Sequence, residues 1–515
     1  MDKRLEEFQQ LLNELAAKGS GGTVDLLLQQ MAQDEARRLR LCAIPHEFDM
    51  SILRTLAPEL SEEQARKDFD AFSRLSLIAQ RGESLAMHDE PRRYLFEQWL
   101  EAGRQNDFRL ASNGLAEYFG ARATQLETEG GSERSDPVER AMRDRMFHLI
   151  GASRAEGLAE FERICRQRRE EMRLGQCETL IKLVHEYDRV LNPLEKAIVA
   201  YHEGKLAADR QEWKTAEELF NRVLATEGVS TQVQVKTLCR LGIINDAQRR
   251  WAAAIDFFKK GLETADERPD CFAQIIHLHL NLGSTYRDSG QLPKAEELLQ
   301  KGITLAKNAH DLSGLADGYN SLGTLYLKLN DIPKAVGTYE LSLKHLEELG
   351  DKFRPAQVYN NLGNAYANQR DWQKSEEFFR RSLEIKRQAG DNAGQALTLT
   401  NLVRVYRAQQ KIPAAIAALE QAATLFAEVR DDYNAGRVKR ELARVHRSMK
   451  QVDLASRAFE EAAALFDRSH EFQEAEATRQ ESHRKERGLP WWAIVAIVLF
   501  VALVLLMIVA IANNW

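Results

Sequence analysis

One motif occurs three times in the middle of the chain, as NLGSTYRDSGQLPKAEELL (Asn281–Leu299), SLGTLYLKLNDIPKAVGTY (Ser321–Tyr339) and NLGNAYANQRDWQKSEEFF (Asn361–Phe379). These copies begin 40 residues apart, and similar windows begin at His202, Arg240, Asn401 and Glu441. A fixed period of this size predicts units of supersecondary structure that stack on one another.

Each copy combines small and large residues at fixed positions. The third position is glycine in the first five copies, and the fifteenth is alanine or serine in all seven. The nineteenth position is large in every copy: Phe220, Phe258, Leu299, Tyr339, Phe379, Leu419 and Phe459. Turn residues such as Ser289-Gly290 separate two helices within each copy. We expect the small residues to meet where the two helices cross and the large residue to fill the remaining space.

This pattern resembles the tetratricopeptide repeat, in a long variant of about 40 residues. The resemblance implies an all-α superhelical solenoid over residues 192–470, built from about seven repeats. It also implies a concave face that is lined by the first helix of each pair and that binds a protein or peptide partner. Residues 138–191 are amphipathic, and we expect them to extend the solenoid as degenerate helical repeats.

The candidate binding residues follow from helix geometry, because positions three and four apart lie on one face of a helix. On the first helices this stripe carries amides in the middle copies and arginines in the last two. The candidate partner-binding residues are therefore Asn320, Asn360, Asn364, Arg404, Arg407, Arg437, Arg440, Arg444 and Arg447. Asparagine both donates and accepts hydrogen bonds, and the arginine fork fits a carboxylate or phosphate. We expect an acidic protein or peptide ligand; the alternative is a solvated basic face without a ligand.

The region before the repeats predicts short helices and a hairpin. Ser61 and Gln64 match a capping box, residues 77–87 look like a short hairpin, and Pro91 suits the first turn of a helix. After an N-terminal helical segment, residues 1–35, these signals predict a small winged-helix-like domain over residues 36–130.

With the triplet Met87-His88-Asp89, this region resembles the winged-helix segment of STAND and NB-ARC signalling ATPases. In those families a helical repeat array often follows the winged helix. The chain contains no G-x-x-x-x-G-K-[ST] phosphate loop, so the resemblance implies the fold but not nucleotide binding.

The C-terminal sequence predicts a membrane anchor. Trp491–Ala512 contains no ionisable side chain, and Trp491, Trp492 and Trp515 flank this stretch as interfacial anchors do. Its 22 residues make roughly 33 Å of helix, enough for a bilayer core of about 30 Å. We predict a basic juxtamembrane helix over residues 471–488 and a transmembrane helix over residues 490–512. Flanking positive charge then predicts a single-pass membrane protein with most of the chain in the cytoplasm and membrane lipid as a further partner.

Composition argues against several other classes of function. The net charge is −6. The helix near Ala65–Leu75, which would enter a DNA groove if the winged helix bound DNA, carries both acidic and basic side chains. Nucleic acid is therefore not the expected partner. The five cysteines are scattered without a C-x-x-C motif, which argues against a disulfide framework or a zinc site. The sequence also lacks HExxH and G-x-S-x-G motifs. We therefore predict no enzyme activity, no cofactor and no metal, and the oligomeric state stays open.

Together these observations predict a membrane-anchored scaffold or adaptor that recruits a protein partner through the groove of its solenoid. One alternative is a STAND-like signalling or defence component that lacks the ATPase and acts with a separate effector. A further alternative is a membrane-tethered winged-helix regulator.

Overall fold

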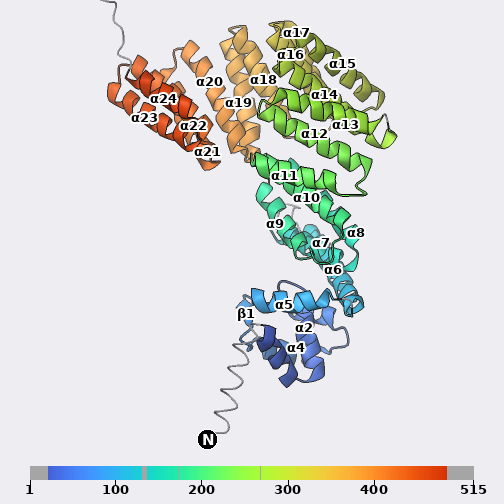
Figure 1. Ribbon diagram of the computed structural model, residues 1–515. Coiled ribbons are helices and arrows are strands. Elements are labelled where there is room, and N and C mark those ends of the chain that lie inside the picture. Colours follow the sequence, from blue (N-terminus) through green and yellow to red (C-terminus); the bar gives the residue numbers. More distant parts are fainter. Residues whose placement is uncertain (1–20, 102, 130–135, 172, 267, 484–515) are drawn as a thin grey trace, which may run out of the picture. The chain divides into compact units, whose positions relative to one another are not determined.

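The computed structural model describes residues 21–101, 103–129, 136–171, 173–266 and 268–483. The chain divides into two compact units, Met1–Thr285 and Tyr286–Trp515, and each unit is described by itself. Both are built almost wholly from helices (Figure 1).

The first unit begins with short helices and one hairpin. Residues 21–30 are helical. The next elements are α2 (Gln33–Leu41), α3 (Met50–Leu56), α4 (Glu62–Phe72), β1 (Ile78–Arg81), β2 (Ser84–Met87) and α5 (Asp89–Trp99). The strands pair antiparallel, with Ile78 opposite Met87, and Gly82 makes the turn at a φ of +64°. As expected, the Ser61 hydroxyl accepts the Gln64 N–H and caps α4.

Longer helices complete the first unit. They are α6 (Gln105–Thr128), α7 (Asp136–Ala152), α8 (Arg154–Glu170), α9 (Leu174–His185), α10 (Pro193–Asp209), α11 (Trp213–Ala225), α12 (Thr231–Ala247), α13 (Trp251–Ala265), the 3₁₀ turn η1 (Pro269–Cys271) and α14 (Phe272–Asp288).

The N-terminal helices and hairpin do not form a separate winged-helix domain. One buried apolar cluster runs without a break from Val24 through Phe96 and Phe147 to Leu206. Helix α6 packs along α7 and also against α3, so the N-terminal elements share their core with the helices that follow. The predicted fold class, in which a small winged-helix-like domain precedes the solenoid, is therefore wrong on this point. The short strands and helices bury too little apolar surface among themselves, so they pack against the apolar side chains of α6 to α9.

The second unit is a succession of helices of similar length, each packed against the next. They are α15 (Leu292–Asn308), α16 (Leu312–Lys328), α17 (Ile332–Glu348), α18 (Pro355–Asn368), α19 (Trp372–Ala389), α20 (Asn392–Ala408), α21 (Ile412–Glu428), α22 (Asp432–Ser448), α23 (Val452–Arg468) and α24 (Phe472–Ser482). The two-helix period agrees with the repeat seen in the sequence.

Five turns of this unit, those before α16, α17, α19, α20 and α22, share one local design. A residue with positive φ, such as Asn330 or Arg430, ends one helix. The aspartate that follows, Asp331 or Asp431, accepts a hydrogen bond from the backbone N–H three residues on and caps the next helix. The chain therefore reverses within a few residues.

The small residues of each repeat have the role that the sequence predicts. The Ser375 hydroxyl donates to the Gly363 carbonyl at 2.7 Å, so two small positions meet where α18 and α19 cross. The ring of Phe379 lies against the same glycine, where a Cβ would come within 2.7 Å of it. Gly363 thus makes room for both helices of its pair.

No helix among the described residues is long and apolar enough to cross a bilayer. The predicted span, residues 490–512, and the predicted anchors Trp491, Trp492 and Trp515 lie outside those residues. The finding overturns the predicted transmembrane helix in the fold class and the predicted single-pass membrane location, and we withdraw both. The described part of residues 471–488 is α24, which carries three glutamates and one arginine.

Candidate functional site

The first helices of the last repeats line a cavity of about 900 Å³ in the second unit. We call it the arginine cavity. Helices α18, α20 and α22 supply most of its wall. Six predicted binding residues line it: Asn360, Arg404, Arg407, Arg437, Arg440 and Arg444. The other three, Asn320, Asn364 and Arg447, are not among its lining residues. Most of the residues that the sequence predicted to share one helix face therefore line one cavity.

The asparagines form a ladder from one repeat to the next. Asn361 donates to the side-chain oxygen of Asn320 at 2.9 Å, and Asn401 donates to that of Asn360 at 3.1 Å. Asn364 donates to the backbone carbonyl of Asn360 at 3.2 Å. Some of the side-chain amides that the sequence predicted to bind a peptide thus join neighbouring first helices to each other.

The arginines divide into two sets. Four pair with carboxylates: Arg407 with Glu441, Arg440 with Glu474, and both Arg444 and Arg447 with Glu481. The Arg444–Glu481 pair is bidentate, at 2.8 Å for each contact. The hydrogen bond and charge of Arg444 lower the pKa of Glu481. Glu474 and Glu481 lie on α24, so this helix neutralises one end of the stripe.

Arg404 and Arg437 form the other set. Both side chains are exposed. Arg404 donates to the side-chain oxygen of Asn368 at 3.4 Å, and Arg437 donates to that of Asn434 at 3.2 Å. Within the described part of the chain, neither arginine has a carboxylate within ion-pair distance. These two guanidinium groups keep the capacity to bind an anion.

The rest of the wall adds charge and apolar surface. Lys386 is buried and donates to the Thr398 hydroxyl and the Gly394 carbonyl, and burial lowers its pKa. Leu397 contributes an apolar side chain that is 49% exposed. The cavity is therefore lined by six cationic side chains, one carboxylate and some apolar surface.

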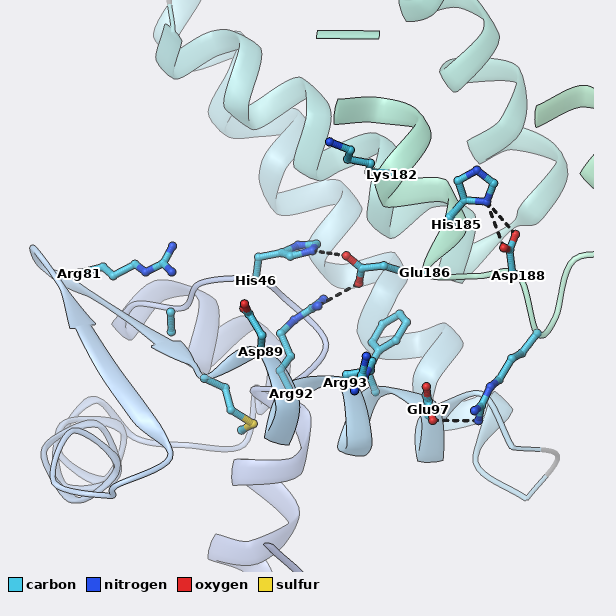
Figure 2. Close-up of a pocket in the computed structure, with 14 residues that line it drawn as sticks. His46, Arg81, Asp89, Arg92, Arg93, Glu97, Lys182, His185, Glu186 and Asp188 are labelled. Carbon is cyan, nitrogen blue, oxygen red and sulfur yellow. Dashed lines mark hydrogen bonds and ion pairs between the residues drawn. The ribbon is translucent and has the colours of Figure 1, made fainter. Parts of the chain in front are cut away.

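A second cavity, of about 570 Å³, lies in the first unit between the hairpin, α5 and α9. At its base His46 Nε2 lies 2.8 Å from one oxygen of Glu186, and Arg92 donates to the other at 2.9 Å. Figure 2 shows both side chains pointing to this carboxylate. Arg92 also donates to the carbonyls of Ile44 and Pro45, and its guanidinium lies 5.2 Å from the ring centre of Phe96. This cluster joins the loop after α2 to the end of α9.

The electrostatics of the second cavity are nearly balanced. Burial would raise the pKa of Glu186, but the His46 hydrogen bond and the Arg92 charge outweigh burial and lower it. At the rim Arg189 pairs with Glu97, and His185 pairs with Asp188 (Figure 2). We assign this cluster a structural role, because its central charges pair with one another.

Metal binding has no visible basis in the part of the chain that the structure describes. No group of three or more His, Cys, Asp or Glu side chains there could hold an ion.

Sequence reasoning missed the residues that neutralise the stripe and the base of the second cavity. Glu481 is 37 residues from Arg444, and Glu186 is 94 residues from Arg92. Neither pair has a local pattern that marks it. The 40-residue period gives one usable signal, since it places α24 one repeat after the arginines and in reach of them.

Comparison with known proteins supports the repeat assignment. A family model for the tetratricopeptide repeat matches residues 274–348 and 354–428. The chain therefore contains tetratricopeptide repeats, whose stacking makes the extended concave surfaces of interaction scaffolds. No curated protein sequence matches the chain.

Several solved structures are similar in fold. One is a STAND protein with a tetratricopeptide repeat sensor from Pyrococcus horikoshii, at 13% identity and a TM-score of 0.50, over 93% of this chain and 66% of that one. This chain thus spans just under two thirds of that protein. The quorum sensor NprR from B. thuringiensis is 15% identical, over 69% of this chain and 98% of that one, with a TM-score of 0.46. A Rap protein in complex with competence and sporulation factor is 14% identical, over 64% and 96%, with a TM-score of 0.45. The likeness to the first of these concerns the fold alone.

Proposed function

We propose that this protein is an interaction scaffold whose arginine cavity binds an acidic peptide segment of a protein partner. The observation that supports the proposal most directly is the pair Arg404 and Arg437. They are exposed, lie in one cavity and face no carboxylate among the described residues.

A surface that is merely solvated gives a different pattern. Exposed arginines on helices commonly pair with a carboxylate three or four residues away, as Arg381 does with Glu377 on α19. Of the six cationic side chains that line the cavity, Arg407, Arg440 and Arg444 pair with carboxylates. This leaves Arg404, Arg437 and Lys386 without an ion pair among the described residues. An excess of one charge in a concave site raises the local concentration of ligands of opposite charge.

The expected ligand has two features. Its carboxylates would bind the forks of Arg404 and Arg437, and each such contact is worth about 1.5–3 kcal/mol. An apolar side chain next to the carboxylates would cover Leu397. The asparagine ladder joins α16, α18 and α20, and the Arg407–Glu441 ion pair joins α20 to α22, the two helices that carry Arg404 and Arg437.

The test uses the full chain and a fluorescent peptide of about ten residues in which glutamate alternates with alanine. The double variant R404E/R437E should weaken binding at least about a hundredfold, because two charge-assisted contacts are lost and repulsion replaces them. R404K/R437K should keep part of the affinity, since charge remains but the fork is lost. Fluorescence anisotropy measures each affinity.

Two controls make the result specific. R457E changes charge by as much as R404E or R437E alone, at an exposed site on α23 outside the cavity, and it should leave binding nearly unchanged. A peptide with glutamine in place of glutamate should not bind. Equal binding by the wild type and R404E/R437E would mean that the arginines form only a solvated face.

A further inference from the structure

A cavity of about 450 Å³ lies between α19, α20 and α21 in the second unit. We call it the tyrosine cavity, because the partly buried ring of Tyr406 forms part of its wall. The apolar residues that line it besides Tyr406 are Leu383, Leu399, Leu402, Ala414, Ala417 and Ala418. Its residues on α20 occupy a different face of that helix from those that line the arginine cavity, so the two sites are separate.

In three earlier repeats, the tyrosine that corresponds to Tyr406 is covered by a lysine eight residues further on. The ammonium groups of Lys294, Lys334 and Lys374 lie 5.5, 5.3 and 5.0 Å from the ring centres of the tyrosines of their own repeats. The period of the sequence places Ala414 at this position in the repeat of Tyr406. A methyl group thus stands where the other repeats have a long cationic side chain, and it lines the cavity.

The repeat before shows which group fills the rest of this space. There the ring of Phe378 stacks on Tyr366, with the ring centres 5.4 Å apart and the planes 6° apart. The period places Ala418 at the position of Phe378, and Ala418 lines the cavity. Among the described residues no aromatic ring stacks on Tyr406. The chain therefore contains, one repeat earlier, an example of the ring that fits against this tyrosine.

The rim of the cavity supplies a charged group. Arg387 is 65% exposed and lies 3.6 Å from the Glu384 carboxylate, which is longer than a hydrogen bond. Arg380, which also lines the cavity, is held by Glu376 at 2.7 Å. The guanidinium of Arg387 therefore keeps the capacity to bind a carboxylate at the edge of an apolar space.

We propose that the tyrosine cavity binds an aromatic side chain of a protein partner, and that Arg387 binds a carboxylate next to that side chain in the partner. The ring would stack on Tyr406 as Phe378 stacks on Tyr366, and it would bury the apolar surface of the leucines. The site does not depend on the arginine cavity, so either proposal can fail without the other.

The experiment measures the binding of a short peptide to the full chain by fluorine NMR. The peptide carries 5-fluorotryptophan followed by glutamate, between serines and glycines, and the wild type should bind it saturably. A418F restores the phenylalanine of the preceding repeat, and it should weaken binding at least about tenfold because its own ring fills the cavity. The same change should raise the melting temperature, since it fills an open space, and this shows that the variant folds.

Three further variants separate the contributions of the ring and the charge. Y406L removes the stacking surface and should weaken binding by about threefold to tenfold, whereas Y406F keeps the ring and should bind as the wild type does. R387Q should weaken binding about tenfold. A peptide with glutamine in place of glutamate should bind the wild type and R387Q equally, because it has no carboxylate for Arg387.

The controls distinguish this site from other binding. A427F adds a ring at an exposed position of α21 outside the cavity and should leave binding unchanged. R404E/R437E should bind the tryptophan peptide as the wild type does, and A418F should still bind the alternating glutamate peptide. The absence of saturable binding, or unchanged binding by A418F, would overturn the proposal. Sedimentation of the wild type alone tests the other occupant: self-association that A418F abolishes would assign the cavity to a second copy of the chain and make the partner assignment wrong.

Discussion

Arg404 and Arg437 differ from the neighbouring arginines of the stripe in one respect, since neither faces a carboxylate in the described chain. The period of the sequence placed all six arginines of the last two repeats on one side of their helices, and five of them line the cavity. It could not show which of them would be neutralised, because Glu474 and Glu481 come from a helix more than thirty residues further on. At the residue scale, a periodic pattern predicts on which face of a helix a side chain lies. Whether its charge is neutralised depends on a partner that is distant in the sequence.

Gly363 offers a test of repeat packing by a single methyl group. In G363A the new Cβ would come within 2.7 Å of the Phe379 ring, which is fully buried and cannot move aside. We expect a loss of about 1–3 kcal/mol in the free energy of unfolding. The matched control is G337A on the exposed side of α17, where a Cβ meets nothing within 4 Å. That change should instead stabilise the protein by about 0.5–1 kcal/mol through helix propensity. Urea unfolding followed by circular dichroism measures both, and a stable G363A would contradict the packing.

The cluster of Arg92, Glu186 and His46 predicts a second difference in stability. R92M should cost about 2 kcal/mol, because it removes charge-assisted hydrogen bonds and leaves the Glu186 carboxylate half-buried beside His46. R189M breaks an ion pair whose arginine is 67% exposed, and it should cost less than about 1 kcal/mol. Hydrogen exchange of the α5 and α9 amides reports the change in the first unit, and equal protection in the two variants would refute the assignment.

The same cluster has a defined dependence on pH. The pKa of Glu186 is lowered in the folded protein, so the paired carboxylate stabilises the fold above the pKa of an unfolded glutamate. That contribution is lost as the pH falls through the lowered value. The stability difference between the wild type and R92M should therefore be full near pH 7 and shrink in acid. A difference that grows as the pH falls would show that the sign is wrong.

At the scale of elements, α24 is held more by charge than by apolar packing. Only Ala475 and Thr478 are buried on it, and Phe472 is 63% exposed. Its carboxylates meet Arg440, Arg444 and Arg447, which explains why six arginines can share a face. The repulsion among like charges on this face is thus relieved within the chain, at one end of the stripe.

Neutral variants of α24 test this arrangement. In E474Q/E481Q the helix loses its charged contacts, and its amides should exchange hydrogen about tenfold faster, since 1.4 kcal/mol changes an equilibrium tenfold. In the cavity Arg440 would then have no ion pair among the described residues and Arg444 would keep only Glu441, so affinity for the glutamate peptide should rise. The control E476Q alters a glutamate of the same helix. Among the described residues its ion pair is with Arg479, also on α24, at 4.0 Å. Unchanged exchange of α24 in the double variant would show that apolar contacts hold it.

At the scale of the whole molecule, the sequence predicted the repeats more securely than it predicted the N-terminal part. The repeats can be recognised in the sequence because each copy packs its two helices with the same kinds of residue. Gly363 lies against Phe379 in one copy, and Gly323 lies against Tyr339 in another. The N-terminal helices and hairpin matched their local signals, such as the Ser61 cap. Their membership in one continuous core depends on contacts with α6 to α9 that no local signal records. The sites differ in the same way. The arginine cavity follows the period of the repeats, whereas the cluster of His46, Arg92 and Glu186 joins residues that no local pattern connects.

The likeness of fold to a STAND protein makes nucleotide binding the last property to test. We expect the chain neither to bind nor to hydrolyse ATP, because its sequence has no phosphate loop and a lysine at the end of such a loop is needed to hold the phosphates. Of the glycine-rich stretch Gly19-Ser20-Gly21-Gly22, the described residues Gly21 and Gly22 are helical, and Gly21 lies against the ring of Tyr94. His88 is exposed at the N-terminus of α5. Calorimetry with Mg-ATP should therefore show no saturable heat, and phosphate release should not exceed that of buffer. Micromolar ATP binding that disappears in H88A, but persists in K214M on α11, would instead place a nucleotide at the segment that resembles the STAND winged helix.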